Sequence, residues 1–391
     1  MKKVAIIGAG VAGIAAAKSA LEENLIPVVF ERDEAIGGVW RVNNGYAWPS
    51  MEVNISRYTN VFSDFPWNDS EKAFPPVGVV NQYLHEYIEH FKLKDYFRLK
   101  CNVTCINKKN EKWEVTWKHD DKTYTELFDT LVWPKWRVPH RPVFSGMENF
   151  SNTIIHSSEF RTADKFKNKK VVVIGNGSSG IAISEEMANA GANVINVFRK
   201  PKWIISRSLP IGDSSLPRDL FNTRAYYPER SYEKMLSSCG EQNEIPNLRM
   251  YKNSVFGKTV QINYVELVKA KKILTMLSEI DSFDKNTLVL KNGQSIDNID
   301  VVVLCTGYQL DLSCFSSELD INPQPLELYE ETFPLMPNLA FLGFIANGRG
   351  SAFPLLELQA RFVMAVLGGR LTLPNEEDMK NAMSKIGRAH V

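Results

Sequence analysis

The sequence predicts an α/β fold with two Rossmann-like nucleotide-binding domains, because one pattern of strand, glycine loop and helix occurs twice in 391 residues. The first copy has the loop GAGVAG at 8–13 after the apolar run 4–7, and the second has GNGSSG at 175–180 after the run 171–174. Each loop precedes a helix-like stretch of small residues. A buried strand that delivers glycines to a helix N-terminus binds pyrophosphate. One chain is therefore predicted to hold two dinucleotides.

The residues of both loops are the first candidates for cofactor binding. A single G-x-G-x-x-G motif is weak, but its recurrence in the same context makes a chance match rare. The expected contacts are Gly8, Ala9, Gly10, Val11, Ala12 and Gly13 in the first loop and Gly175, Gly177, Ser178, Ser179 and Gly180 in the second.

The end of the following strand distinguishes the two sites. Glu31, with Arg32 after it, stands about twenty residues beyond the first loop, and its carboxylate can accept hydrogen bonds from both ribose hydroxyls of FAD or NAD. Arg199 and Lys200 stand at nearly the same register in the second copy. They would pair with a 2′-phosphate that a carboxylate would repel. The second site is predicted to prefer NADPH; a solvated basic turn is the alternative interpretation.

Composition is typical of a soluble globular enzyme. Hydrophobic residues make up 44%, charged residues 23% and the net charge is +1, which argues against disorder and against a nucleic-acid-binding surface. Five scattered cysteines indicate a reducing compartment, and six scattered histidines form no metal motif. No apolar run approaches the ~18 residues of a membrane span. Because the basic and apolar N-terminus is explained as strand and phosphate loop, the expected location is cytoplasmic.

Domain organisation follows from the order of the predicted strands. The run Val301–Leu304 is expected to return to the first domain's sheet, so that an NADPH-binding domain over 161–297 is inserted into an FAD-binding domain over 1–160 and 298–391. The polar, proline-punctuated stretch 210–250 is expected to be a partly helical insertion near the substrate.

Local patterns predict two further elements. A helix is expected around 80–91, and the alternating stretches 113–117 and 123–128 predict a hairpin around Asp120-Asp121.

Several other motifs follow in a fixed order. They are GGVW at 37–40, Asn54 ahead of FSDFP at 62–66, the partial fingerprint Phe150, Asn152, His156 and Phe160, and ELQAR at 357–361. In this order the chain resembles the class B flavin-dependent monooxygenases, the group of the flavin-containing monooxygenases and their Baeyer–Villiger relatives, over nearly its whole length.

The resemblance implies a reaction and a set of cofactor contacts. NADPH would reduce FAD, and the reduced flavin would react with oxygen to give a 4a-(hydro)peroxide that transfers one oxygen atom to a small organic substrate. The flavin contacts implied are Gly38, Val39, Trp40, Asn54, Val103, Thr306, Gly307 and Gln359. A carrier-bound substrate and a homodimer are further expectations.

Two residues are candidates for the chemistry. The neutral amide of Asn54 can hold the peroxide and the retained nicotinamide in a dry site, although a turn-forming asparagine is the alternative. Arg57 is the basic residue nearest to Asn54 in this segment, and it is the candidate cation beside the peroxide. A protonated peroxide attacks amines and sulfides, whereas a deprotonated one, favoured by a cation, attacks carbonyls. His156 is expected to be structural.

Departures from the family pattern shape the alternatives. Phe160 stands where the Baeyer–Villiger group has tryptophan, which favours oxygenation at nitrogen or sulfur. Baeyer–Villiger insertion beside a carbonyl is the alternative reaction. Pro134-Lys135 replaces the usual Thr-Gly step, which keeps an uncoupled NADPH oxidase or a partner subunit as an alternative. The mammalian type has a hydrophobic C-terminal anchor, and no counterpart of it is expected here. A flavin disulfide reductase is disfavoured, because Cys101 and Cys105 would be too far apart on a strand to bridge.

Overall fold

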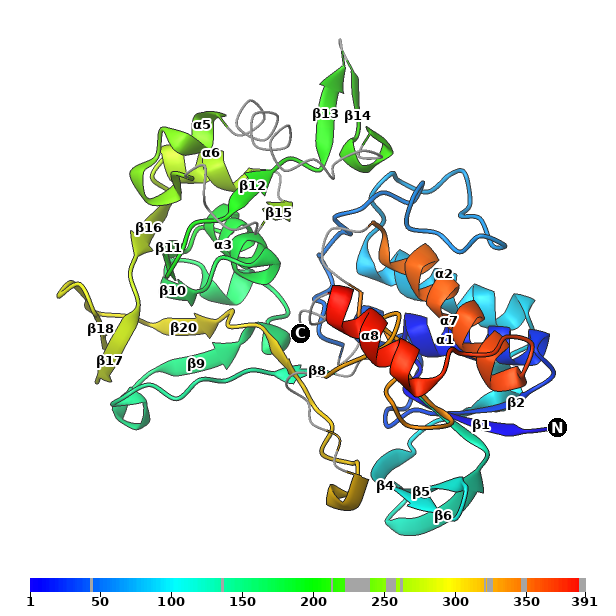
Figure 1. The fold of residues 1–391 in the computed structure, drawn as a ribbon. Coiled ribbons are helices and arrows are strands. Elements are labelled where there is room, and N and C mark those ends of the chain that lie inside the picture. Colours follow the sequence, from blue (N-terminus) through cyan, green and yellow to red (C-terminus); the bar gives the residue numbers. More distant parts are fainter. Residues whose placement is uncertain are drawn as a thin grey trace. The chain divides into compact units, whose positions relative to one another are not determined.

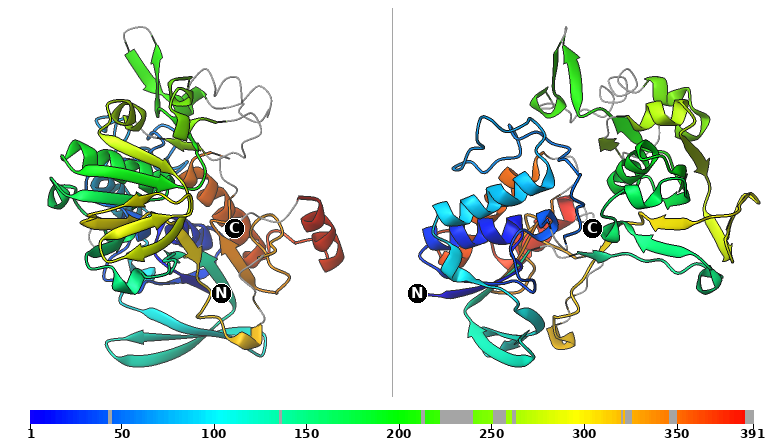
Figure 2. Two further views of the ribbon diagram at one scale, coloured as in Figure 1. Left: turned by 90° about the vertical axis from the view of Figure 1, so that its left-hand side faces the viewer. Right: turned by 180° about the vertical axis from the view of Figure 1, so that it is seen from behind.

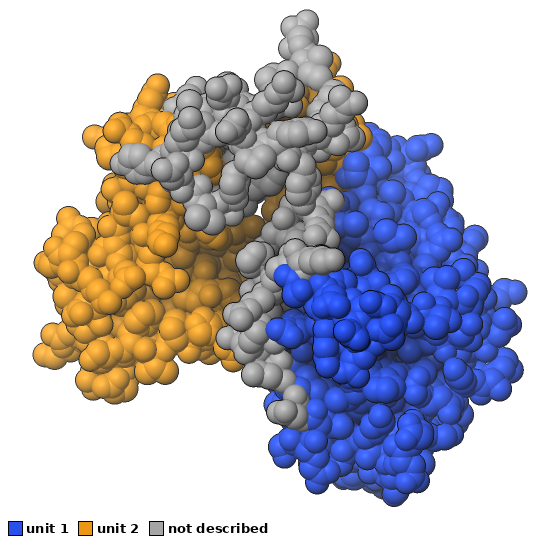
Figure 3. All heavy atoms as spheres, viewed as in Figure 1, with its two compact units in different colours: residues 1–47, 57–138, 310–391 blue, residues 48–56, 139–309 orange. Residues whose placement is uncertain are grey.

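The computed structural model describes residues 1–42, 45–134, 137–211, 214–221, 240–250, 258–260, 263–319, 321, 326–345 and 350–386. The chain divides into two compact units, coloured separately in Figure 3. Unit 1 comprises 1–47, 57–138 and 310–391, and unit 2 comprises 48–56 and 139–309. Lys135 of the unusual Pro134-Lys135 step lies outside the described residues.

Unit 1 contains a five-stranded parallel sheet in the order β22-β7-β1-β2-β3. Figure 1 shows α1, α2 and α7 together on one face of this sheet and the antiparallel sheet β4-β5-β6 on the other. The strands are β1 (Lys3–Ile7), β2 (Ile26–Phe30), β3 (Phe97–Arg98), β4 (Asn102–Lys109), β5 (Lys112–His119), β6 (Lys122–Phe128), β7 (Thr130–Pro134) and β22 (Leu339–Leu342), and the helices are α1 (Val11–Glu22), α2 (Val77–His90), α7 (Ala352–Gly368) and α8 (Glu376–Ile386).

The two sheets of unit 1 share a hydrophobic core. On β5 the side chains of Trp113, Val115 and Trp117 are buried at every second position, as alternation on a half-buried strand requires. They pack with Phe30 and Trp133 from the parallel sheet. The first glycine loop begins at the carboxyl end of β1, the central strand of the parallel sheet.

Unit 2 contains a second parallel five-stranded sheet, in the order β16-β11-β10-β20-β9. Its strands are β9 (Thr153–His156), β10 (Lys170–Ile174), β11 (Asn193–Phe198), β16 (Ile273–Leu277) and β20 (Val301–Leu304), and its helices are α3 (Ser178–Asn189), α5 (Gly240–Asn243) and α6 (Tyr264–Lys269). Smaller sheets pair β12 (Trp203–Ile205) with β15 (Lys258–Val260), β13 (Ser208–Ile211) with β14 (Ser214–Pro217), and β17 (Ile280–Asp284) with β18 (Thr287–Leu290), which in turn pairs with β19 (Ser295–Ile296).

The described residues also form several short elements. The strands β8 (Arg137–Pro139) and β21 (Tyr308–Leu310) form a two-stranded sheet. The 3₁₀ turns are η1 (Gly38–Trp40), η2 (Lys94–Tyr96), η3 (Met147–Asn149), η4 (Ser157–Glu159), η5 (Asp164–Phe166), η6 (Arg218–Phe221), η7 (Pro246–Leu248) and η8 (Ser317–Leu319).

The expected place of Val301–Leu304 is wrong. This run forms β20, which lies between β10 and β9 in the sheet of unit 2. The strand that returns to the sheet of unit 1 is β22, which pairs with β7. An apolar run specifies a buried parallel strand but carries no information about which neighbours it takes. The unit boundaries therefore fall at 138/139 and 309/310 rather than at 160/161 and 297/298, and residues 48–56 belong to unit 2.

The two local predictions are confirmed. Helix α2 spans Val77–His90, and β5 and β6 form the antiparallel hairpin. Asp120 and Asp121 connect them with φ of 45° and 60°, the left-handed conformation that a two-residue hairpin turn needs. Within the expected insertion 210–250, the described residues form the β13–β14 hairpin, η6, α5 and η7, while 212–213 and 222–239 lie outside the described residues.

Candidate active site

Two positions of the first glycine loop require glycine, Gly8 because of its backbone conformation and Gly13 because of close packing. The Gly8 N–H donates to the Phe30 carbonyl at 2.7 Å, and Gly8 has φ of +114°. A Cβ on Gly13 would lie 1.9 Å from the Gly8 oxygen. Helix α1 begins directly after Gly10, and no side chain in the described part of the chain caps its N-terminus. Its first backbone N–H groups therefore remain available for an anion such as phosphate.

The Gly37-Gly38 turn packs against this loop. The Gly37 N–H donates to the Ala9 carbonyl at 2.9 Å, and a Cβ on Gly38 would lie 3.0 Å from the Gly10 Cα. Val39 and Trp40, with Gly38, form η1. Close packing of glycine backbones is the arrangement that lets a dinucleotide approach the main chain.

Asn81 on α2 is a site residue that the sequence reasoning missed. Its Nδ2 would lie 2.4 Å from a Cβ on Gly37, so the amide reaches the glycine turn. That nitrogen is buried and has no hydrogen-bond partner among the residues that the structure describes. A buried amide without a partner is costly and calls for one. The only sequence signal is an asparagine, a poor helix former, near the start of a predicted helix.

Glu31 is buried at the end of β2. Its carboxylate accepts hydrogen bonds from the Ala9 N–H at 2.8 Å and the Asp33 N–H at 3.0 Å. Burial raises the pKa of this carboxyl group, and the two N–H donors partly oppose the shift. Because each oxygen keeps a second lone pair, Glu31 can still accept from a ribose. Arg32 beside it is exposed.

The second glycine loop repeats this construction in unit 2. The Gly175 N–H donates to the Val197 carbonyl at 2.8 Å. A Cβ on Gly175 would lie 2.4 Å from the Cys305 oxygen, and one on Gly180 would lie 2.1 Å from the Gly175 oxygen. Helix α3 begins after Gly177 without a side-chain cap, and Ser178 and Ser179 form its first turn.

Basic side chains stand beside the second loop. Arg199 and Lys200 are exposed at the end of β11. The Asn176 side chain donates to the Lys200 carbonyl at 2.7 Å, which ties the basic turn to the loop. Lys202 was missed: its Nζ lies 3.9 Å from the position of a Cβ on Gly177. The signal available in the sequence was a third basic residue following the same strand.

The two candidate catalytic residues fall in different units. Asn54 is exposed and belongs to unit 2. Arg57 belongs to unit 1, where its guanidinium donates to the Asp69 carbonyl at 3.1 Å and lies 3.8 Å from the Asp69 carboxylate. It also lies 4.6 Å from the centre of the Tyr58 ring. The structure therefore does not bring Asn54 and Arg57 into one unit, although only two residues separate them.

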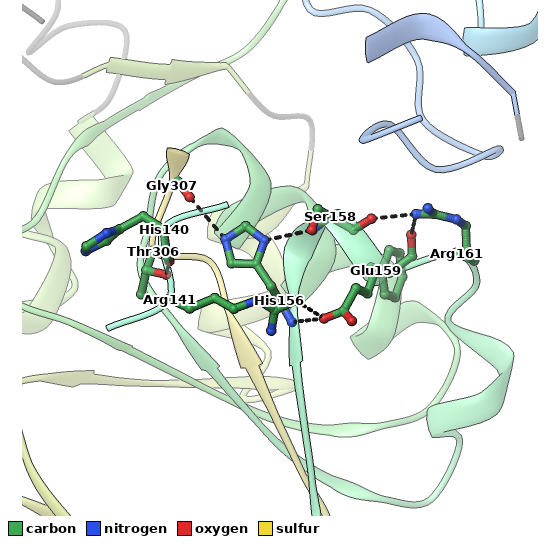
Figure 4. A network of polar contacts seen from close by, with 9 residues as sticks. His140, Arg141, His156, Ser158, Glu159, Arg161, Thr306 and Gly307 are labelled. Carbon is green, nitrogen blue, oxygen red and sulfur yellow. Dashed lines mark hydrogen bonds and ion pairs between the residues drawn. The ribbon is translucent and has the colours of Figure 1, made fainter. Parts of the chain in front are cut away.

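His156 is the hub of a polar network drawn in Figure 4. Its Nδ1 accepts from the Ser158 backbone N–H at 3.1 Å, so the other nitrogen, Nε2, carries the hydrogen and donates to the Gly307 carbonyl at 3.1 Å. The His156 N–H donates to Glu159, which pairs with Arg141 at 2.5 Å. The imidazole is fully buried, and burial lowers its pKa. This is a neutral, structural histidine.

Four other residues that were predicted to contact a cofactor make contacts within the protein itself. Thr306 and Gly307 follow β20 in unit 2, and the Thr306 hydroxyl donates to the His140 carbonyl at 2.5 Å. Val103 is buried in the core of unit 1. The Gln359 side chain accepts from the Gly343 N–H at 2.9 Å, just beyond β22.

Two kinds of feature are absent from the described part of the chain. No group of three or more histidine, cysteine or acidic side chains is placed to hold a metal ion there. None of the helices within those residues has the length and apolar character needed to cross a membrane.

Comparison with known proteins decides the family. The flavin-binding monooxygenase-like family model matches residues 1–389. The chain belongs to this family. It is 30% identical to dimethylaniline monooxygenase (N-oxide-forming) 4 of Mus musculus over 420 residues, covering 98% of this chain and 73% of that protein.

Solved structures have the same fold. S-allyl-L-cysteine S-oxygenase from Allium sativum matches with a TM-score of 0.70 at 22% identity, over 98% of this chain and 81% of that one. A cyclohexanone monooxygenase variant from Rhodococcus sp. Phi1 bound to NADP+ matches with a TM-score of 0.74 at 18% identity, over 98% and 90%.

Membership in the flavin-binding monooxygenase-like family establishes the activity. The chain is a flavin-dependent monooxygenase that uses FAD, NADPH and molecular oxygen. The fold is a mixed α/β fold with parallel sheets, similar to those flavin monooxygenase structures.

Proposed function

We propose that unit 1 binds FAD and unit 2 binds NADPH. The support is the opposite charge at the two equivalent strand ends. Glu31 ends β2 and is an acceptor for ribose hydroxyls, whereas Arg199 and Lys200 end β11 and Lys202 stands beside the loop. Cations pair with the 2′-phosphate that distinguishes NADPH from NADH.

The residues present fit both cofactors. Each loop has glycines at positions where a Cβ would clash, and an uncapped helix N-terminus that suits a pyrophosphate. The partnerless amide of Asn81 adds a donor beside the Gly37 turn for a polar group of FAD. When bound, FAD supplies the activation of molecular oxygen, and NADPH supplies the reducing electrons.

We propose that the oxygen acceptor is a nitrogen or sulfur atom of a small organic molecule. Attack by an amine or sulfide needs an electrophilic, protonated oxygen donor, whereas insertion beside a carbonyl needs a deprotonated one that a cation stabilises. Arg57 was the candidate cation, and it is engaged by Asp69 and Tyr58 in unit 1. This engagement of Arg57 is the observation that carries the proposal.

Asn54 remains the proposed donor at the reacting oxygen. Its carboxamide is neutral, so it can donate a hydrogen bond without delivering a proton as an acid would. The side chain is exposed and makes no hydrogen bond with any residue that the structure describes. It is therefore available for a bound ligand.

A substrate panel tests the proposal. The purified holoenzyme is given NADPH and oxygen with a tertiary amine, a thioether or a cyclic ketone, and NADPH consumption, peroxide release and oxygenated product are measured together. N-oxide or sulfoxide formed in proportion to NADPH is the expected result. Lactone from the ketone with no heteroatom product would overturn the assignment, and stoichiometric peroxide with every substrate would indicate an oxidase.

The four described cysteines support the proposed cytoplasmic location. Cys101, Cys105, Cys305 and Cys314 are all unpaired. Free thiols persist in a reducing compartment.

A further inference from the structure

The segment that carries Asn54 is clamped on its N-terminal side by Arg207. The Arg207 guanidinium forms an ion pair with the Glu52 carboxylate, and its Nη1 donates to the Val53 carbonyl at 3.3 Å. The Arg207 side chain is only 14% exposed, so solvent screens its interaction with Glu52 less than it would screen a surface ion pair. The two contacts of this guanidinium, with Glu52 and with Val53, are called the Arg207 fork. The two residues directly before Asn54 are thus held by one side chain.

On the C-terminal side the segment is clamped by Asp219. One carboxylate oxygen accepts from the Ser56 N–H at 3.2 Å and the other from the Ser56 hydroxyl at 2.6 Å. Ser56 is fully buried. Together the two clamps fix the backbone at both sides of Asn54 and leave its amide exposed between them.

Both clamps stand at the base of one hairpin. Arg207 directly precedes β13, and Asp219 follows β14. The Arg218 N–H donates to the Arg207 carbonyl at 2.8 Å, which closes the base of the hairpin. Figures 1 and 2 show β13 and β14 projecting from the body of unit 2. The hydrogen bonds between β13 and β14 therefore hold Arg207 and Asp219 at a fixed distance from each other.

A separate anchor ties the start of the segment to unit 2. The Trp48 Nε1 and the Ser50 hydroxyl both donate to the Glu186 carboxylate on α3, each at 2.5 Å. Helix α3 is the helix that begins at the second glycine loop. The segment 48–56 is consequently built into the unit that carries this loop.

We propose that Arg207 and Asp219 are positioning residues for Asn54. The proposal rests on the role proposed for Asn54 above. A carboxamide can direct its N–H at a reacting atom only if its backbone is held, and a displacement of about 1 Å can cost on the order of a hundredfold in rate. The residues that bracket Asn54 supply this constraint without touching the reacting atoms.

The clamp itself is tested without turnover. Hydrogen–deuterium exchange of the peptide covering 48–57 is compared in wild type, R207M, R207K and D219A. Exchange is expected to rise in R207M and D219A and to rise less in R207K, because a lysine keeps the charge opposite Glu52 but lacks the fork. The control K291M removes an exposed ion pair with Glu279 at 2.7 Å in the same unit and is expected to leave this peptide unchanged. Unchanged exchange in both R207M and D219A would overturn the clamp.

Kinetics then test its consequence. The ratio of oxygenated product to NADPH consumed, with kcat and KM, is measured for N54A, R207M and the double variant N54A/R207M at equal FAD content. R207M is expected to lower kcat on the order of tenfold and to raise peroxide release with little change in KM. In the N54A background, R207M is expected to cause little further loss of kcat or of product per NADPH, because both substitutions act through the Asn54 amide.

The outcomes separate the two proposals. If N54A alone leaves coupling and kcat at the wild-type level, the proposed role of Asn54 fails and the positioning role fails with it. If N54A uncouples the enzyme while R207M and R207K do not, Asn54 keeps its role and only the positioning proposal is overturned. If R207M lowers activity equally in the wild-type and N54A backgrounds, Arg207 acts independently of Asn54, which also overturns it.

Discussion

The Glu357 carboxylate accepts two hydrogen bonds from Ser63, one from its backbone N–H at 2.8 Å and one from its hydroxyl at 2.5 Å, across a separation of 294 residues. Glu357 is buried on α7. The pair joins the FSDFP and ELQAR motifs within unit 1. Two motifs found separately in the sequence are thus parts of one hydrogen-bonded structure.

Glu357→Gln is expected to destabilise unit 1 by about 1–3 kcal/mol, because a buried charge-assisted interaction is weakened and one donor is left poorly satisfied. Urea denaturation followed by tryptophan fluorescence measures this. The control Glu89→Gln changes an exposed acid on α2 and is expected to stay within about 0.5 kcal/mol. Equal stabilities of E357Q and wild type would show that the pair contributes nothing.

Alanine at the third glycine of each loop is expected to separate the two cofactor sites. In G13A a Cβ would lie 1.9 Å from the Gly8 oxygen, and in G180A it would lie 2.1 Å from the Gly175 oxygen. G13A is expected to be purified without FAD. G180A is expected to keep FAD but to be reduced slowly by NADPH.

The flavin absorbance of the purified protein and the rate of anaerobic reduction measure these effects. Gly78→Ala is the matched control, because a Cβ at Gly78 would have its nearest neighbour at 4.0 Å. On α2 this alanine is tolerated or slightly stabilising. Loss of FAD from G180A with retention in G13A would reverse the assignment of the units.

Removing the basic pair in R199A/K200A is expected to raise the KM for NADPH at least about tenfold while changing the KM for NADH little, because the loss of even one charge-assisted contact to phosphate costs about 1.5–3 kcal/mol. Steady-state kinetics with both nucleotides give the ratio of the KM for NADPH to the KM for NADH. Lys169→Ala, an exposed lysine at the opposite end of β10, serves as control. A proportional rise for NADH and NADPH would argue against recognition of the 2′-phosphate.

Acid is expected to destabilise the protein through His156. Burial holds the native pKa below the ordinary value of about 6.5. Above that value the imidazole is neutral in both states. As the pH falls below about 6.5, the unfolded state binds the proton first and stability is lost until the pH passes the lowered native pKa.

Thermal unfolding of wild type and H156Q across this pH range measures the effect. H156Q is expected to be less stable at neutral pH and to show a shallower loss of stability on acidification. His85→Gln, which changes an exposed histidine on α2, should keep the wild-type pH dependence. Parallel pH profiles for wild type and H156Q would contradict the assignment.

Two of the described cysteines are expected to resist thiol reagents in the native protein. Burial raises the pKa of Cys314 to about 12 and also raises the pKa of Cys305. Neither forms the thiolate that reacts, whereas Cys105 is exposed. Mass spectrometry after brief alkylation at about pH 8, a pH below both raised pKa values, should find Cys105 modified before Cys305 and Cys314. Rapid labelling of Cys305 would contradict its burial.

The sequence determined the local elements, because each rests on a constraint that acts within a few residues. Gly13 and Gly180 have no room for a Cβ at the turn from strand to helix, and Asp120 adopts the positive φ that its hairpin requires. Apolar runs and alternation likewise identified β1, β10 and β5. The family resemblance rested on the order of such local motifs.

Only the tertiary structure decided which distant segments meet. The run Val301–Leu304 was expected in one sheet and lies in the other, since an apolar strand satisfies either. Asn54 and Arg57 are near neighbours in the chain, yet they belong to different units. The fork of Arg207 on Glu52 spans more than 150 residues and leaves no local pattern. Burial and long-range hydrogen bonding determine which of these segments contact each other, and no short window of sequence encodes either.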